Sequence, residues 1–521
     1  MKYRLSPSPR AEELAGQLSV RDAINQVCCP LFNFDASATL GGGHMARATA
    51  EQIRVRIEAL RSVCNVPPLC TADLECGAGR AVLGLTVFPD LMALGANDSE
   101  DLAYEVGKAT ALEGRSVGLN WTFSPCVDVA ELPDSPAVST RSAGRSVERV
   151  IKTARGYLRG LQDHGMVATL KHFPGDGYTT YDQHLTTVNI PFGMEEWWRG
   201  PGRIYRELID AGARTIMAGH IALPAYDEKD AVLGLYPPAT LSPRLLGDLL
   251  RGELGFEGLL VSDAMNMAGV AGFMHPFESY ARFLEAGGDM VLFPRVSDAS
   301  FYSEMERLLA GGQLTEHTLY DRAARVLAFK EDLGLLSGPG ARHELASEFD
   351  AAAHAALARR VTEGAIALVR DRAGTLPVRL EPSTRVLHVV LSPSYEEDKA
   401  IYAALTSALG RRANVEQLID PGPHVLFERA REFDLIVCSI GAITNWGVNV
   451  ARLHGPICRN LMGGWMRLGT PVVFVDHIHP FSHLEYAPVM DCVLNTFRSL
   501  EATGERLVRG LVGEQPFTGK F

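Results

Sequence analysis

The feature that most constrains the fold is a regular alternation of short apolar runs with segments of helical period through residues 1–330. We expect a first strand near 26–32 and further strands at 67–74, 119–129, 167–173, 214–221, 258–265 and 289–294. Helical patterns lie between them, for example at 98–113, 145–164, 194–211, 241–253 and 276–287. Apolar strands that alternate with helices form parallel βα units, and this number of units favours a (β/α)8 TIM-type barrel over a doubly wound sheet.

A second domain is expected after a change of composition at 336–346, where Gly, Pro and polar residues predict a linker. A helical stretch at 346–369 follows, and new apolar strands are expected at 385–392, 434–440, 471–477 and 491–497. Helical patterns such as 396–410 separate these strands, which predicts a smaller open α/β sheet. The expected protein is therefore α/β, with a barrel at 1–337, a linker and connecting helix at 338–360 and an αβα sandwich at 361–521.

Charge and composition exclude several classes of partner. The 521 residues carry 50 Lys and Arg against 62 Asp and Glu, a net charge of -12 that repels phosphate backbones and anionic lipid. We therefore expect neither a nucleic-acid nor a membrane partner. The chain begins without the apolar core of a secretory signal, and its nine cysteines fit neither a disulfide framework nor a paired zinc motif. These features predict a reduced, cytoplasmic protein. We expect a monomer or a homodimer, although no sequence feature selects between the two.

Polar residues recur where the predicted barrel strands end. All strands of such a barrel point their carboxyl ends at one rim, where barrel enzymes place their chemistry. Six side chains at or just beyond five strand ends therefore predict a site there. They are Asp73, Asp128, Lys171, His172, His220 and Asp263.

The segment 171–184, KHFPGDGYTTYDQH, leaves a buried strand and enters a glycine-rich loop that carries Asp182 and His184 two residues apart. A carboxylate close to an imidazole can orient the ring and raise its basicity, which suits a general acid/base. The alternative is a structural turn with solvated side chains. The Lys-His pair directly before the loop favours the catalytic interpretation.

The segment 258–267, GLLVSDAMNM, fixes Asp263 at the end of another apolar run. Such a carboxylate can act as a nucleophile on an anomeric carbon, as a metal ligand or as a general base, or it can cap the next helix. His220 can contact a substrate or buttress the site.

Together these segments resemble glycoside hydrolase family 3, and particularly its β-N-acetylglucosaminidase branch. KHFPGDGYTTYDQH resembles the family's signature loop, and GLLVSDAMNM resembles its nucleophile strand. Supporting motifs stand in order along nearly the whole chain, at 71–79, 123–129, 216–227, 238–256 and 363–378. The chain differs from the branch at Asp176, where His is frequent, and at Ala264, where an acidic residue is common.

The resemblance implies a role for each matching position. Asp263 falls on the nucleophile, His184 on the acid/base and Asp182 on its partner in a dyad. Four further residues fall on groups that bind sugar hydroxyls in the −1 subsite, and they are Asp73, Arg141, Lys171 and His172. A nucleophile opposite a proton donor gives double displacement with retention of configuration.

The expected function is a retaining exo-β-glycoside hydrolase that acts on a small carbohydrate, with terminal β-linked N-acetylglucosamine as the favoured sugar and glucose or xylose as alternatives. Neither a cofactor nor a metal is expected. A phosphorylase with the same residues, which uses inorganic phosphate as its second substrate, stays open because a histidine acid/base does not repel phosphate. A non-catalytic sugar-binding protein is disfavoured, since Asp263, Asp182 and His184 are all present.

Overall fold

The computed structural model describes residues 1–521 except 32–39, 65, 337–347, 499 and 501–502. The chain divides into two compact units. The first comprises Met1–Val87, Ala103–Val129 and Val150–Ala351, and the second comprises Phe88–Leu102, Ala130–Arg149 and Ala352–Phe521. The second unit thus takes in two segments from within the range expected for the barrel. Of the linker predicted at 336–346, residues 337–346 lie outside the described residues.

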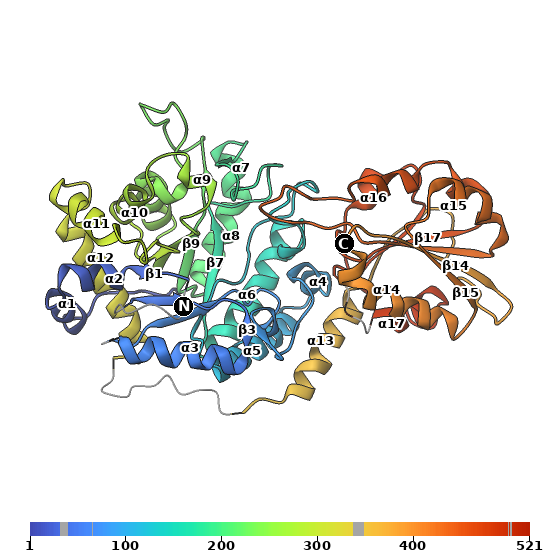
Figure 1. The fold of residues 1–521 in the computed structure, drawn as a ribbon, viewed down its shortest axis with the longest axis horizontal. Helices are drawn as coiled ribbons and strands as arrows, with labels where there is room; N and C mark the ends of the chain where they lie inside the picture. The colour runs from blue at the N-terminus through green and yellow to red at the C-terminus, as the bar shows by residue number, and fades with distance from the viewer. Residues whose placement is uncertain (32–39, 65, 337–347, 499, 501–502) are drawn as a thin grey trace. The chain divides into compact units, whose positions relative to one another are not determined.

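The first unit is built on parallel strands, some of them labelled in Figure 1, and pairing between the strands closes them into a ring. The strands that form it are β1 (Cys28–Cys29), β2 (Gly42–His44), β4 (Leu69–Ala72), β6 (Trp121–Thr122), β7 (Val167–Phe173), β9 (Thr215–Ala218), β11 (Leu259–Ser262) and β12 (Val291–Leu292). The order β11-β9-β7-β6-β4-β2 is hydrogen-bonded, β1 pairs with β12, and the bridges Leu31–His44 and Val261–Met290 join the two sheets. The predicted TIM-type barrel is confirmed.

Seven of these strands lie within the ranges that the sequence predicts, although several are only two residues long. Strand β2 was not expected. Its sequence, Gly42-Gly43-His44, follows Leu40 and Gly41 and offers no apolar run. Pairing with β4 places it in the ring.

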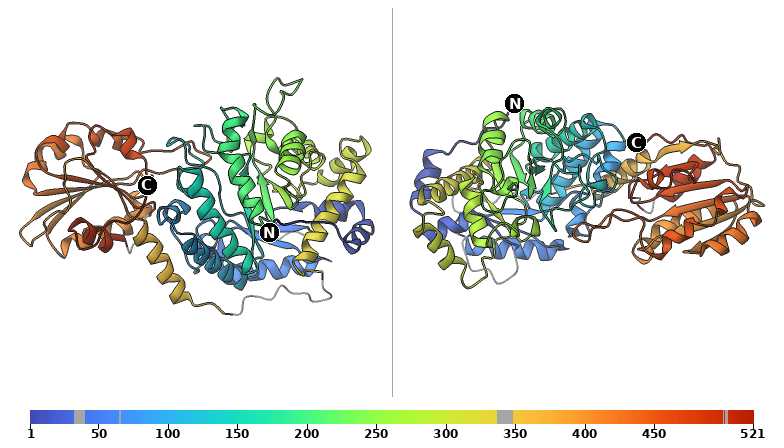
Figure 2. Two further views of the ribbon diagram at one scale, coloured as in Figure 1. Left: turned by 180° about the vertical axis from the view of Figure 1, so that it is seen from behind. Right: turned by 90° about the horizontal axis from the view of Figure 1, so that it is seen from above.

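Helices surround the ring, as Figures 1 and 2 show. They are α1 (Pro9–Gly16), α2 (Val20–Gln26), α3 (Ala50–Val63), α5 (Glu100–Ser116), α6 (Val147–Asp163), α7 (Met194–Arg199), α8 (Pro201–Asp210), α9 (Ala268–Ala271), α10 (Pro276–Glu285), α11 (Phe301–Ala310), α12 (Glu316–Asp332) and the π-helix η4 (Arg244–Glu253). The helix expected at 194–211 is divided at Gly200, because Pro201 begins a new helix and has no N–H to continue the old one.

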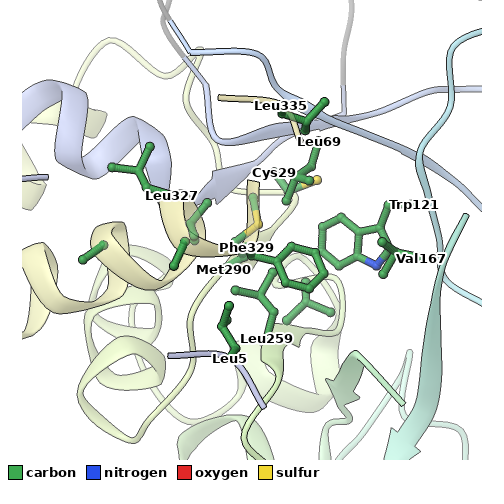
Figure 3. Close-up of a cluster of buried hydrophobic side chains, with 14 of the residues drawn as sticks. Leu5, Cys29, Leu69, Trp121, Val167, Leu259, Met290, Leu327, Phe329 and Leu335 are labelled. Atoms are coloured by element: carbon green, nitrogen blue, oxygen red, sulfur yellow. The ribbon is translucent and has the colours of Figure 1, made fainter. Parts of the chain in front are cut away.

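The interior of the ring is an apolar core, drawn in Figure 3. Trp121 is fully buried there, and its indole N–H donates to Thr169 Oγ1 at 2.8 Å and to Thr215 Oγ1 at 3.2 Å. Leu5 and Phe329 belong to the same cluster and come from the N-terminal segment and from α12. One side of the ring is thereby filled with apolar side chains, and the polar groups are left to the strand ends.

The second unit contains a six-stranded sheet in the order β13-β18-β17-β16-β14-β15, with β13 antiparallel at one edge. Its strands are β13 (Ala367–Asp371), β14 (Arg385–Leu391), β15 (Asn414–Ile419), β16 (Leu435–Ile440), β17 (Val472–Asp476) and β18 (Cys492–Asn495). Its helices are α4 (Leu91–Ala96), α13 (Ala351–Ala365), α14 (Tyr395–Gly410), α15 (Pro423–Arg429), α16 (Ser482–Glu485) and α17 (Thr503–Leu511). Separate apolar clusters cover its two faces, which makes it the expected αβα sandwich.

The two edge strands were missed by the sequence prediction. Four of the five residues of β13 and all six of β15 are partly or fully exposed. The apolar residues of β13 fall at the end of the stretch 346–369 that was expected to be helical, and β15 has no continuous apolar run. Among the described residues, no helix is both long and apolar enough to cross a membrane.

A buried carboxylate anchors the barrel close to β12. Asp289 accepts hydrogen bonds from Arg251 Nη2 and Arg325 Nε, each at 2.8 Å, and from the backbone N–H of Leu260 at 2.8 Å. Burial opposes its ionisation, but the surrounding arginines outweigh burial and lower the pKa of Asp289 to about 2.

We expect Asp289→Ala to lower the free energy of unfolding by about 3–5 kcal/mol, because it leaves buried arginines without their counter-charge. The control Glu306→Ala breaks an exposed pair with Arg21 and should cost less than about 1 kcal/mol. Because the pKa of Asp289 in the folded state lies below its ordinary value, the stabilisation of the fold by this carboxylate is present above about pH 4 and is lost as the pH falls towards 2. Urea denaturation across this pH range measures the free energy of unfolding of both variants and its dependence on pH. Equal losses of stability in the two variants would contradict the role of Asp289 as the counter-charge of the buried arginines.

Candidate active site

Strand β7 carries Lys171 and His172 close to its carboxyl end, and the fold buries both side chains at the rim. Lys171 is almost fully buried, and its ammonium group lies 3.0 Å from Asp73 Oδ1 and 2.6 Å from Glu75 Oε1. The side chain of Asp73 is 48% exposed, so one end of this cluster faces solvent. His44, at the end of β2, places Nε2 3.6 Å from Asp73 Oδ2. Lys171 and Asp73 are thus brought together as predicted, and Glu75 and His44 are additions that the sequence interpretation gave no role.

His172 lies between two carboxylates. Its Nδ1 is 2.6 Å from Asp128 Oδ2, and its Nε2 is 3.9 Å from Asp263 Oδ2. The imidazole side chain is only 5% exposed. Because Nδ1 faces a carboxylate, it carries the hydrogen of this contact, and Nε2 is the atom directed at Asp263.

Asp263 directly follows β11, where its backbone N–H donates to Ala218 O at 2.8 Å. One carboxylate oxygen, Oδ1, accepts the Ala264 N–H at 2.7 Å. Burial disfavours the charged carboxylate, but the charges of His172 and His220, together with this N–H, lower the pKa of Asp263 below its ordinary value. The residue is therefore ionised at neutral pH and fixed on a rigid strand end.

Asp182 and His184 form the pair that their spacing suggests. Asp182 Oδ1 lies 2.6 Å from His184 Nδ1 and also accepts the backbone N–H of His184 at 2.9 Å. Asp182 is buried, whereas the His184 side chain is 21% exposed. The loop packs against the segment after Asp263, since Ala268 N–H donates to His184 O at 3.0 Å. The dyad and the expected nucleophile are therefore held in one region.

His220 has protein partners on both ring nitrogens. Nδ1 lies 3.0 Å from Thr240 Oγ1, and Nε2 lies 3.0 Å from the carbonyl oxygen of Ala264, next to Asp263. Its side chain is fully buried, and its backbone N–H donates to Gln183 Oε1 at 2.9 Å. These contacts favour the interpretation that His220 buttresses the site over direct contact with a substrate.

Arg141 belongs to the second unit, where it ends the short helix η2 (Ser139–Arg141). Its Nη1 donates to Ala137 O at 2.7 Å. Its role in sugar binding stays a prediction.

Asp176 adds a buried carboxyl group to the glycine-rich loop. Its Oδ1 accepts the Gly177 N–H at 2.7 Å, and its backbone N–H donates to Asp128 Oδ1 at 2.9 Å. Burial, and next the negative charge of Asp128, raise the pKa of Asp176 to about 7. The extra negative charge that the sequence places in this loop is thus largely suppressed by protonation below neutral pH.

One cluster of metal-ligating residue types occurs in the part of the chain that the structure describes, and it comprises Cys126, Asp128 and His172. Their donor atoms lie within 4.8 Å of one another. However, the Asp128 oxygens already accept hydrogen bonds from His172, and Cys126 Sγ lies 3.2 Å from Asp128 Oδ2. These contacts account for the cluster, and we assign it no metal.

Comparison with known proteins identifies the family of the chain. Residues 37–329 match the family model described as the glycosyl hydrolase family 3 N terminal domain. A beta-N-acetylglucosaminidase/beta-glucosidase from Cellulomonas fimi is 32% identical over 506 residues, which cover 92% of this chain and 87% of that protein.

Two solved structures are similar over nearly the whole length. The beta-glucoside phosphorylase BglX superposes with a TM-score of 0.89 at 26% identity, covering 98% of this chain and 95% of that one. A family 3 beta-N-acetylglucosaminidase from Paenibacillus sp. str. FPU-7 superposes with a TM-score of 0.79 at 24% identity, covering 96% and 98%, and shows the fold. The matched domain model and the full-length relative together establish that this chain belongs to glycoside hydrolase family 3 and is a glycosidase.

Proposed function

We propose that the protein is a retaining exo-β-glycoside hydrolase in which Asp263 is the nucleophile and the His184–Asp182 pair is the acid/base. The observation that carries this proposal is that an ionised carboxylate and a hydrogen-bonded His–Asp pair are held in the same region of the barrel. Asp263 is ionised and fixed on a strand, whereas His184 is bound to Asp182 at 2.6 Å on a loop that packs against the segment after Asp263.

The chemistry follows from these two environments. Asp263 attacks C1 of the sugar while His184 Nε2, protonated, gives its proton to the departing glycosidic oxygen, so a covalent glycosyl–Asp263 ester forms. Neutral His184 then takes a proton from a water molecule, whose oxygen attacks C1 and releases Asp263. Two inversions leave the β configuration unchanged. Asp182 stabilises the imidazolium formed in this second step and keeps Nδ1 turned away from the sugar.

Charged side chains at the strand ends are the proposed sugar-binding groups. Asp73, Lys171 and His172, with Arg141, are proposed to hydrogen-bond the hydroxyl groups of the −1 sugar, because bonds to charged groups are shorter and stronger than neutral ones. Lys171 is pre-positioned for this by Asp73 and Glu75. Terminal β-linked N-acetylglucosamine is the favoured substrate, in line with the name of the Cellulomonas fimi relative, and β-glucosides are the alternative.

Phosphorolysis is a second candidate function, favoured by the similarity to a beta-glucoside phosphorylase. A carboxylate acid/base would repel an incoming phosphate by about 4 kcal/mol per unit charge at about 4 Å in a partly screened site. A neutral imidazole carries no such penalty. His184 is therefore compatible with either water or phosphate as the acceptor.

We expect Asp263→Asn to reduce the turnover of a nitrophenyl β-N-acetylglucosaminide by at least about 10³-fold, because the amide cannot form the ester. Asp248→Asn removes the same charge at an exposed position on η4 and should leave the rate unchanged. Steady-state assays with a thermal melt for each variant provide the measurement. A folded Asp263→Asn enzyme with the wild-type rate would disprove the nucleophile assignment.

His184→Ala should lose more activity on substrates with poor leaving groups than on activated aryl glycosides, since only the former need proton donation. We expect the two losses to differ by at least about tenfold. Comparing kcat/KM for a series of aryl glycosides and an alkyl glycoside measures the difference, with the exposed His317→Ala as the matched control. Equal losses across the series would count against the acid role.

Hydrolysis predicts that phosphate leaves the rate and the product unchanged. NMR analysis of the products, with phosphate compared against sulfate at equal ionic strength, should then show only the free sugar in its β configuration. A phosphate-dependent acceleration that yields sugar 1-phosphate would replace the hydrolase assignment with that of a phosphorylase.

A further inference from the structure

Asp128 is a heavily hydrogen-bonded carboxylate beside His172, and the proposed reaction gives it no role. It follows β6, and its side chain is fully buried. Oδ1 accepts the backbone N–H groups of His172 at 3.0 Å and of Asp176 at 2.9 Å, and Oδ2 accepts His172 Nδ1 at 2.6 Å. These bonds compensate the burial of a charge that would otherwise be strongly unfavourable.

The same bonds fix the ring of His172. Both its backbone N–H and its Nδ1 are tied to one carboxylate, so the imidazole cannot turn without breaking the 2.6 Å contact. Its Nε2 is therefore held towards Asp263 Oδ2, 3.9 Å away. A ring that carries a proton on each nitrogen places a positive charge between two carboxylates, which stabilises both of them.

We propose that Asp128 is a positioning residue for the nucleophile, which acts through His172 to keep Asp263 ionised and oriented. The inference rests on the proposed role of Asp263 in catalysis. In addition to that role, Asp128 is the buried group that maintains the positive charge of His172 beside Asp263.

The surroundings of both carboxylates are compatible with this coupling. The charged or titratable groups that act on Asp263 are His172, His220 and His184, and the first of these has the largest charge effect on it. The groups around Asp128 include His172, Asp176, Cys126 and Tyr205. Burial opposes the ionised form of Asp128, and the charge and hydrogen bonds of His172 lower its pKa below the ordinary value.

Asp128→Asn is the informative variant because it retains the shape and removes the charge. The two backbone N–H groups require the amide oxygen at the Oδ1 position, so the amide NH2 takes the Oδ2 position and faces His172 Nδ1. It then donates to that nitrogen, which leaves the ring neutral with its hydrogen on Nε2. Asp263 loses the positive charge beside it, its pKa rises, and activity is lost at a higher pH than in the wild type.

The test is the pH profile of kcat/KM on a nitrophenyl β-N-acetylglucosaminide for the wild type, Asp128→Asn and Cys126→Ala. We expect the acid limb of Asp128→Asn to move up by about one pH unit or more. Cys126→Ala alters the packing around the same carboxylate without changing charge, and its acid limb should stay in place. A folded Asp128→Asn enzyme with an unmoved limb, or equal shifts in both variants, would overturn the proposal.

If Asp128→Asn does not fold, the pH profile of His172→Asn tests the proposal instead. Loss of the ring removes the same positive charge beside Asp263, so the acid limb of kcat/KM must shift upward in this variant as well. An unmoved limb in that variant also overturns the proposal. A separate experiment distinguishes failure of the proposed function from failure of the role of Asp128. The wild-type intermediate is trapped with a 5-fluoro β-glycoside, and peptide mapping identifies the labelled residue. A label away from Asp263 refutes the proposed function, whereas a label on Asp263 with an unmoved limb refutes the role of Asp128 alone.

Discussion

Closure of the parallel strands into a ring brings the carboxyl ends of β4, β7 and β11 to one rim, and the rest of the site depends on this constraint. The strands themselves are short, so few ladder hydrogen bonds hold each one. Apolar filling of the ring, with Trp121 satisfied by two threonine hydroxyls, stabilises the closed arrangement. Polar chemistry is thereby concentrated where the strands end.

Each charged group described at that rim has a partner of opposite charge or a hydrogen-bond partner. Lys171 lies between Asp73 and Glu75, and His172 lies between Asp128 and Asp263. Burial of an unpaired charge would cost several kcal/mol or shift its protonation. Asp176 illustrates the second outcome, because it has no cationic side chain bonded to it in the described part of the chain and its pKa rises to about 7. Ion pairs and hydrogen bonds offset the burial of Lys171 and of Asp128.

The sequence was sufficient to predict the barrel, the sandwich and the residues of the rim, because apolar runs mark buried strands and polar residues mark their ends. It could not predict which side chains contact these rim residues. Glu75 and His44 meet Lys171 and Asp73 only through the register of β2, β4 and β7, and β2 itself has no apolar signal. Asp128 was expected at the rim, but its contacts with His172 and Asp176 join segments about 44 to 48 positions apart. Periodicity contains no information about such contacts.

The two proposed reacting groups reside on different kinds of scaffold. Asp263 belongs to the strand framework, whereas Asp182 and His184 are both supplied by a single continuous excursion after β7, with their mutual hydrogen bond internal to it. Both members of the proposed proton-transfer pair therefore lie on one loop. Exchange of residues 174–187 between family members would therefore replace the proposed acid/base pair as one piece and leave the proposed nucleophile, Asp263, on its strand end.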